Sequence, residues 1–148
     1  MTNKTPLALG TYRMSIKSPQ HKKALIQALD EGVSLIDTSS NYTGGDSERL
    51  LGSVFKEKSY MGRLVSKAGY IQGDIFNTLE DLESRLEGEV LRIDENLAHC
   101  IHPVFLKSQL QQSLNRLGKN KLDVFLLHNP EYFFKKNSDK DEYYKRLE

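Results

Sequence analysis

The stretch "LIDTSSNYTGGDSERLLG" (residues 35–52) decides the fold that we predict. It begins as a short apolar strand ending at Asp37, runs through small polar residues to Tyr42, and turns at two glycines. It continues as an amphipathic helix that should start near Asp46 or Ser47. A strand, a polar loop and a helix in this order make one βα unit, with the aspartate at the carboxyl end of its strand.

Similar units recur along the chain. Short apolar runs at 7–9, 33–36, 64–65 and 122–127 predict four strands, with helical periodicity between most of them. One helix should start at Ser18, and another should cover about 103–117 and stop at Gly118. The run 122–127 is nearly all apolar, which predicts a strand covered on both faces. This alternation predicts an α/β fold with a parallel sheet.

Two segments modify this pattern. The insert at about 71–102 is longer than a usual βα loop, and apolar residues at helical spacing within 78–87 predict an extra helix over one end of the sheet. A further helix should start at Ser138, close to the last residue. A (β/α)8 barrel needs about 250 residues. We therefore interpret residues 1–148 as one partial domain, about the first half of such a barrel, with the remainder absent.

The composition excludes several classes of function. The 148 residues carry a net charge of +1 with acidic and basic residues interleaved, so no nucleic-acid-binding or membrane-binding surface is expected. No apolar run approaches membrane-spanning length, and the first residues lack the apolar core of a secretory signal. The one cysteine, Cys100, excludes an internal disulfide and is typical of a reducing compartment. We expect a cytoplasmic protein.

Three polar residues fall at the carboxyl ends of predicted strands: Asp37, Lys67 and His128. Tyr42 lies in the loop after the second strand. In (β/α)8 barrels the active site is built at this end of the strands, so these residues should converge although they are distant in sequence.

The four residue types fit one reaction. A tyrosine has an ordinary pKa of about 10, and a neighbouring ammonium group favours its phenolate. An aspartate can hold that lysine in place, while a histidine can hydrogen-bond a substrate carbonyl. Such a site protonates a carbonyl oxygen as a hydride reaches the carbon. Because these side chains supply no hydride, a nicotinamide cofactor is implied.

The sequence resembles the aldo-keto reductase family in four segments, in the family's order. They are "LGTY" (9–12), "DTSSNYTGGDSERLLG" (37–52), "VSKAGY" (65–70) and "LQQSLNRLGKNKLDVFLLHNPE" (110–131). The resemblance implies a (β/α)8 barrel that reduces aldehydes or ketones, a small carbonyl substrate, and NADPH as cofactor. It places the catalytic tetrad on Asp37, Tyr42, Lys67 and His128, with Tyr42 as general acid/base. Thr11, Tyr12 and Asp37 would contact the cofactor.

The chain departs from the family pattern in ways that predict an incomplete protein. The hairpin that precedes the first strand in the family is short or missing, and strands five to eight, which bring most of the cofactor site, are absent. We therefore expect weak NADPH binding and self-association through open sheet edges. The alternative function is a non-catalytic binding or assembly subunit, or a truncated remnant.

Two other patterns have simpler interpretations. His99, Cys100 and His102 are close in sequence, but a structural zinc site needs four ligands and no second cluster follows, so we expect no metal. The segment "TGGDSE" (43–48) matches neither the P-loop nor the dinucleotide fingerprint. Its glycines are expected to let the backbone turn after Tyr42, with the helix capped by Asp46 or Ser47.

Overall fold

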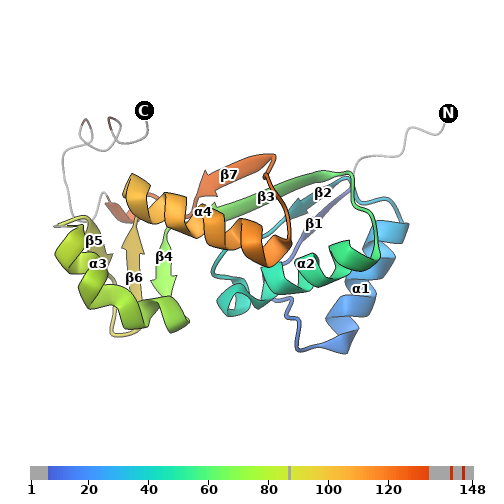
Figure 1. The fold of residues 1–148 in the computed structure, drawn as a ribbon, viewed down its shortest axis with the longest axis horizontal. Helices are drawn as coiled ribbons and strands as arrows, with labels where there is room; N and C mark the ends of the chain where they lie inside the picture. Colours follow the sequence, from blue (N-terminus) through green and yellow to red (C-terminus); the bar gives the residue numbers. More distant parts are fainter. Residues whose placement is uncertain (1–6, 87, 134–140, 142–144, 146–148) are drawn as a thin grey trace.

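The structure of the protein is a computed structural model, which describes residues 7–86, 88–133, 141 and 145. Its main sheet contains four parallel strands in the order β1-β2-β3-β7 (Figure 1). Their bounds are Ala8–Gly10, Leu35–Asp37, Arg63–Ala68 and Val124–Leu127. The predicted parallel βα repeats are confirmed, and they form part of a barrel. The helix predicted to start at Ser138 lies outside the described residues.

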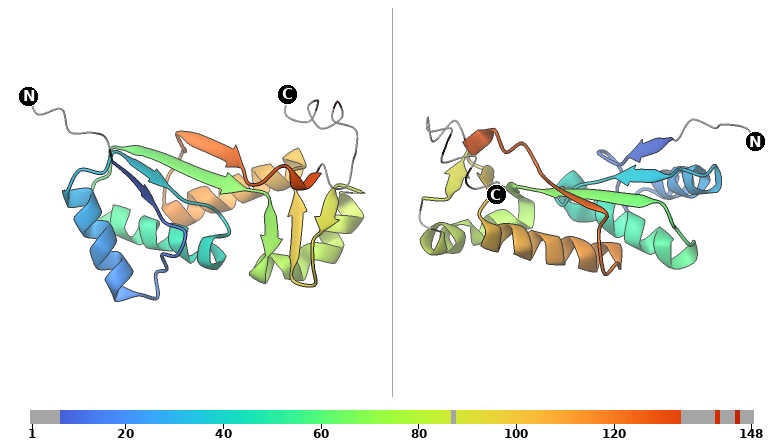
Figure 2. Two further views of the ribbon diagram at one scale, coloured as in Figure 1. Left: turned by 180° about the vertical axis from the view of Figure 1, so that it is seen from behind. Right: turned by 90° about the horizontal axis from the view of Figure 1, so that it is seen from above.

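Three helices pack against one face of this sheet (Figure 2). They are α1 (Pro19–Asp30), α2 (Asp46–Glu57) and α4 (Pro103–Leu117), and their bounds confirm the predictions. The Ser18 hydroxyl accepts the His21 N–H at the start of α1, and Gly118 ends α4 in the left-handed conformation. The buried core between the helices and the sheet consists of Leu25, Ile36, Leu50, Leu51, Val54, Leu64 and Leu117.

Helices α2 and α4 approach each other closely at Gly52. A Cβ atom at this position would lie 2.1 Å from the backbone oxygen of Arg116, so a side chain has no space there. One turn earlier, the buried Glu48 carboxylate accepts from Arg116 Nε at 2.7 Å and from Ser66 Oγ at 2.6 Å. These bonds join α2 to both α4 and β3, and they satisfy a carboxylate that would otherwise be costly to bury.

The insert contains the helix that we predicted within 78–87, and it also contains a sheet that we did not predict. It forms a second sheet of three antiparallel strands in the order β4-β6-β5, with bounds Tyr70–Gln72, Leu97–Cys100 and Val90–Arg92. The 3-10 helix η2 (Gly73–Thr78) and the short helix α3 (Leu79–Arg85) pack against this sheet. The strands were missed because each is only three or four residues long, too short for a clear alternating pattern.

Strand β7 also corrects a prediction, because it is not covered on both faces. Val124 and Leu126 are 40% and 42% exposed on the face opposite the helices. They pair with Val65 and Lys67 of β3, and β7 is an edge of the described sheet, as is β1. The long apolar run is therefore typical of the full barrel, whose interior would cover this face. Among the described residues, no helix has the length and hydrophobicity needed to cross a membrane.

Candidate active site

The four predicted catalytic residues meet at the carboxyl end of the parallel sheet. Asp37 is the last residue of β2, Lys67 lies near the end of β3, and His128 follows β7. Lys67 Nζ lies 2.6 Å from Asp37 Oδ1 and donates to the Thr38 backbone oxygen at 2.7 Å. It also lies 5.0 Å from the ring centroid of Tyr42, whose ring is 5.8 Å from that of His128.

The loop after β2 turns sharply enough to bring Tyr42 back over Lys67. Tyr42 begins the 3-10 helix η1 (Tyr42–Gly45), in which Thr43, Gly44 and Gly45 all have positive φ angles of 49°, 65° and 84°. Glycine adopts this left-handed backbone without steric cost, which explains the glycine pair. The Thr43 hydroxyl donates to the Met14 backbone oxygen at 2.7 Å and fixes the loop against the segment after β1.

The two residues after β1 differ in their access to the site. Thr11 is fully buried, its hydroxyl donates to the Asp37 backbone oxygen at 3.1 Å, and it accepts from Ser47 Oγ at 2.7 Å. Tyr12 is 64% exposed, and its ring packs edge-on against Tyr42 with 5.1 Å between centroids. Tyr12 can therefore meet a bound molecule directly, whereas Thr11 supports the end of β2. The predicted cofactor contact of Thr11 stays a prediction.

His128 is held by residues that the sequence analysis missed. Its Nδ1 lies 2.9 Å from Ser39 Oγ, and its ring packs against Tyr70 with 4.8 Å between centroids. His99 Nε2, on strand β6 of the insert, donates to the His128 backbone oxygen at 2.6 Å. His99 is a buried strand residue, and nothing in its local sequence indicated this partner.

The electrostatic surroundings favour a neutral His128. Burial, followed by the charges of Lys67 and His99, lowers the pKa of His128, which the carboxylates of Asp37 and Glu131 only partly oppose. Burial also lowers the pKa of His99. A neutral imidazole has one donor and one acceptor nitrogen, so the tautomer of His128 decides what it can offer to a ligand.

A cleft of about 550 Å³ opens beside these residues. Its lining comes from the antiparallel sheet and from the segments that follow β1, β2 and β7: Tyr12, Arg13, Asn41, Tyr42, Thr43, Tyr70, Gln72, Leu97 and His128. The general acid candidate Tyr42 and the hydrogen-bonding candidate His128 thus share one cleft. Aromatic rings with a few polar groups are the usual lining of a small-molecule site.

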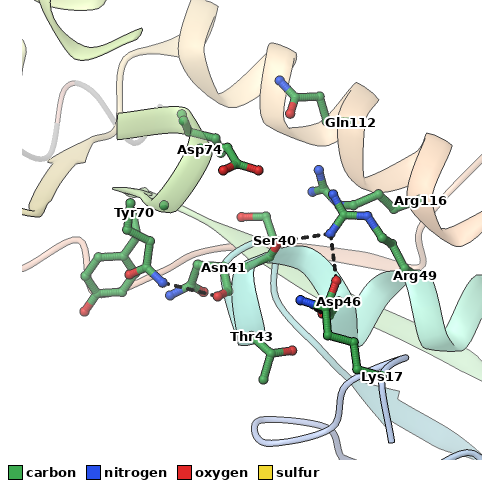
Figure 3. A pocket seen from close by; sticks show the side chains of 14 residues that line it. Lys17, Ser40, Asn41, Thr43, Asp46, Arg49, Tyr70, Asp74, Gln112 and Arg116 are labelled. Atoms are coloured by element: carbon green, nitrogen blue, oxygen red, sulfur yellow. Dashed lines mark hydrogen bonds and ion pairs between the residues drawn. The ribbon is translucent and has the colours of Figure 1, made fainter. Parts of the chain in front are cut away.

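A second hollow of about 490 Å³ lies between η1, α4 and the insert (Figure 3). Lys17 and Arg49 both pair with Asp46, at 3.3 and 3.2 Å, and Arg116 pairs with Glu48. Because its basic residues are matched by acidic ones, this hollow has no strong preference for an anion. In the described part of the chain, no group of three or more His, Cys, Asp or Glu residues is arranged to hold a metal ion.

Comparison with known sequences places this arrangement in a family. Residues 6–148 match the aldo/keto reductase family. An NAD(P)H-dependent 6'-deoxychalcone synthase from Glycine max is 32% identical over 109 residues, covering 74% of this chain and 27% of the relative. An NADH-specific methylglyoxal reductase from Escherichia coli is 27% identical over 108 residues, covering 70% of this chain and 29% of the relative. The chain therefore spans little more than a quarter of these two relatives.

Solved structures share the fold. An aldo-keto reductase from Bacillus halodurans superposes with a TM-score of 0.64 and 19% identity, covering 82% of this chain and 35% of that protein. A protein described as the putative aldo-keto reductase of Pseudomonas aeruginosa gives a TM-score of 0.63 with 23% identity, covering 97% of this chain and 49% of that protein. Both likenesses support part of a (β/α)8 barrel.

Proposed function

This chain belongs to the aldo/keto reductase family, and we propose that it carries the proton-transfer half of an NADPH-dependent carbonyl reductase. The observation that carries the proposal is the position of Lys67 Nζ, 2.6 Å from Asp37 Oδ1 and 5.0 Å from the Tyr42 ring. An ammonium group held in this way can stabilise negative charge on the phenol oxygen of Tyr42. Because the chain spans a minority of its relatives' length, the activity of the whole protein is part of the proposal.

Each residue of the site has one role in this proposal. Tyr42 donates its hydroxyl proton to the oxygen of an aldehyde or ketone, and it is left as a phenolate beside Lys67. Asp37 keeps Lys67 in place, and His128 donates a hydrogen bond to the same carbonyl oxygen. In the reverse direction the phenolate accepts the proton of an alcohol, so Tyr42 acts as general acid or base.

A reduced nicotinamide cofactor would supply the hydride that the carbonyl carbon receives. Of this chain's residues, the exposed ring of Tyr12 and the Asp37 carboxylate fit contacts with the nicotinamide end, with Thr11 proposed beside them. The names of the two sequence relatives support a nicotinamide cofactor, one being NAD(P)H-dependent and the other NADH-specific. NADPH is our choice by resemblance to the family.

The variant Tyr42→Phe tests the catalytic proposal, because it keeps the ring and removes the transferable proton. Carbonyl reduction should fall by about 10²–10⁴-fold, the usual contribution of a general acid, with cofactor binding nearly unchanged. The assay would use the 148-residue chain and any longer protein that contains it. Tyr60→Phe is a matched control, because the Tyr60 hydroxyl binds the Arg63 backbone oxygen away from the site. Unchanged turnover in Tyr42→Phe would remove Tyr42 from its role.

The alternative is a non-catalytic subunit in which the fold serves assembly, and the exposed inner face of β7 favours it. In that case the edges at β1 and β7 would pair with further strands, and the isolated chain would self-associate. Light scattering and an NADPH titration on the 148-residue chain distinguish the possibilities. A monomer that binds NADPH at micromolar concentration would contradict both self-association and the expected incomplete cofactor site.

A further inference from the structure

We propose that Ser39 is a positioning residue that holds His128 as the Nε2–H tautomer, while His99 of the insert fixes the backbone of the same histidine. The use of this tautomer rests on the proposed function, because a protonated Nε2 can donate to a substrate carbonyl. The tautomer itself depends on the contacts of Ser39 and is measurable without any reaction. Neither Ser39 nor His99 belongs to the four residues that the family resemblance assigns to catalysis.

The hydroxyl of Ser39 has one proton and three neighbours that can accept it. The fully buried Ser39 Oγ lies 2.9 Å from His128 Nδ1, 2.7 Å from Asn41 Oδ1 and 3.1 Å from the Lys67 backbone oxygen. The Lys67 oxygen already receives the Ser40 backbone N–H at 3.0 Å. A half-turn of the Asn41 amide would present its N–H to Ser39 Oγ. Donation to His128 Nδ1 then leaves all three neighbours with a partner.

This arrangement directs the two sides of the imidazole to different environments. Nδ1 faces the buried Ser39, whereas His128 also lines the cleft shared with Tyr42 and Tyr70. When Nδ1 accepts from Ser39, the single proton of the neutral ring must be on Nε2. A hydrogen bond to the nitrogen away from a ligand is the usual way in which proteins fix a histidine tautomer.

The insert supports the same residue from its backbone side. A carbonyl oxygen only accepts, so His99 Nε2 must carry the proton in its 2.6 Å contact with the His128 oxygen. At Gly69 a Cβ atom would lie 2.6 Å from His99 Nε2 and 2.8 Å from the His128 oxygen. Because Gly69 has no side chain, the His99 ring of the insert can contact the His128 backbone directly after β7.

Charged groups act on His128 from every element around it, and those that lower its pKa outweigh those that raise it. The charged or titratable groups that act on His128 are Lys67 of β3, Asp37 of β2, His99 of β6 and Glu131 after β7. The rings of Tyr42 and Tyr70 contact it edge-on. A Ser39 hydroxyl that donates to Nδ1 also favours the neutral His128 ring, because a protonated Nδ1 has no lone pair to accept the bond.

Nitrogen-15 NMR of the histidine side chains tests the proposal on the 148-residue chain without substrate or cofactor. In the unmodified chain, both His128 and His99 should be Nε2–H tautomers at pH values above their titration. In Ser39→Ala, His128 should lose this uniform tautomer, and its titration midpoint should rise by up to about one pH unit, since one hydrogen bond to the neutral form is removed. His99 should be unchanged and reports that the fold is retained.

Ser40→Ala is the matched control. Ser40 is the next residue and is 5% exposed, but its hydroxyl makes no hydrogen bond to the described part of the chain. Its variant should leave the His128 tautomer and midpoint as they are. A His128 Nδ1–H tautomer in the unmodified chain would overturn the proposal, as would a Ser39→Ala variant in which tautomer and midpoint are both unchanged.

The same measurements separate this proposal from the proposed function. An active protein in which Ser39→Ala shifts the acid limb of the pH–rate profile upward, together with the NMR change, supports both. A chain that shows the NMR result but reduces no carbonyl compound supports the role of Ser39 and contradicts the proposed reaction. An active protein without the NMR result supports the reaction and overturns the role of Ser39.

Discussion

The two sheets of this protein contribute to the candidate site in different ways. The parallel sheet is assembled from strands far apart in sequence, and it supplies the side chains of Asp37, Lys67 and His128. The antiparallel sheet is built within residues 70–100, has its own apolar core, and lies beyond the carboxyl ends of β3 and β7 (Figure 1). It contributes lining residues and the backbone contact of His99. The comparison teaches that the candidate catalytic side chains and part of the cleft wall come from different units of the fold.

The largest effect in this comparison is expected for carbonyl reduction when Lys67 of the parallel sheet is changed. Lys67→Met removes the ammonium group between Asp37 and Tyr42, and carbonyl reduction should fall by at least about 100-fold because charge on the phenol oxygen loses its partner. Steady-state kinetics would measure it. Lys58→Met, which removes a surface ion pair with Asp30, is the control and should retain activity. A Lys67→Met protein as active as the control would break the assignment.

Paired truncations in the two cores test whether the sheets are separable. Leu51 and Ile71 are both fully buried, in the parallel core and the insert core respectively. Each change to Ala should cost about 2–5 kcal/mol. We expect Leu51→Ala to lower the free energy of global unfolding in urea, and Ile71→Ala to speed hydrogen exchange mainly within 70–100. Equal acceleration throughout the protein by Ile71→Ala would show that the sheets unfold as one unit.

A smaller effect concerns pH, through the two histidines at the junction of the sheets. The pKa values of His99 and His128 are lowered in the folded state, chiefly by burial. Below the ordinary histidine pKa of about 6.5, the unfolded chain therefore binds more protons than the folded chain. The contribution of these histidines to the free energy of unfolding should therefore be complete above about pH 6.5 and should decline as the pH falls through that value. The slope is at most about 1.4 kcal/mol per pH unit for each histidine. Urea unfolding from pH 5 to 8 would measure it, and a flat profile would contradict the burial argument.

The smallest effect lies on the surface of the insert. Arg92 makes two 2.7 Å bonds to Glu83, but their side chains are 53% and 32% exposed. Water screens such pairs, so Arg92→Ala should leave the free energy of unfolding nearly unchanged. Urea unfolding beside Arg85→Ala, which removes another exposed pair in the insert, provides the comparison. A clear loss of stability in Arg92→Ala but not in Arg85→Ala would mean that this pair joins the insert sheet to α3 more strongly than its exposure indicates.

The sequence predicted the parallel part well because its signals are local and its motifs are specific. Ser18, Pro19 and Gly118 mark helix ends, and the residue types after three strands indicated which side chains would converge. The insert was predicted poorly because three-residue strands such as Val90–Arg92 have no measurable periodicity. The exposure of β7 could not be predicted from its own residues, because their apolar character is typical of a barrel interior that these 148 residues only partly enclose.

The supports of His128 were unpredictable for a different reason. Ser39 and His128 are 89 residues apart, and His99 and His128 are 29 apart, so only the tertiary structure brings them together. A serine two residues after Asp37 resembles any polar loop residue. Gly69 carried a signal that was not used: a glycine directly after a strand often marks a close approach of two backbones.

The antiparallel insert also has a consequence for the order of folding. Strand β3 pairs with β7 although a long segment separates them in sequence, and the entropy cost of closing a loop grows with its length. The Cys100 N–H donates to the Gly69 oxygen at 2.8 Å, so a folded insert brings together the two ends of its own segment. We expect the insert to form early, which would lower the entropy cost of pairing β7 with β3. Variants at Ala98 should then slow folding, whereas variants at Leu126 should mainly speed unfolding, as a φ-value comparison would reveal.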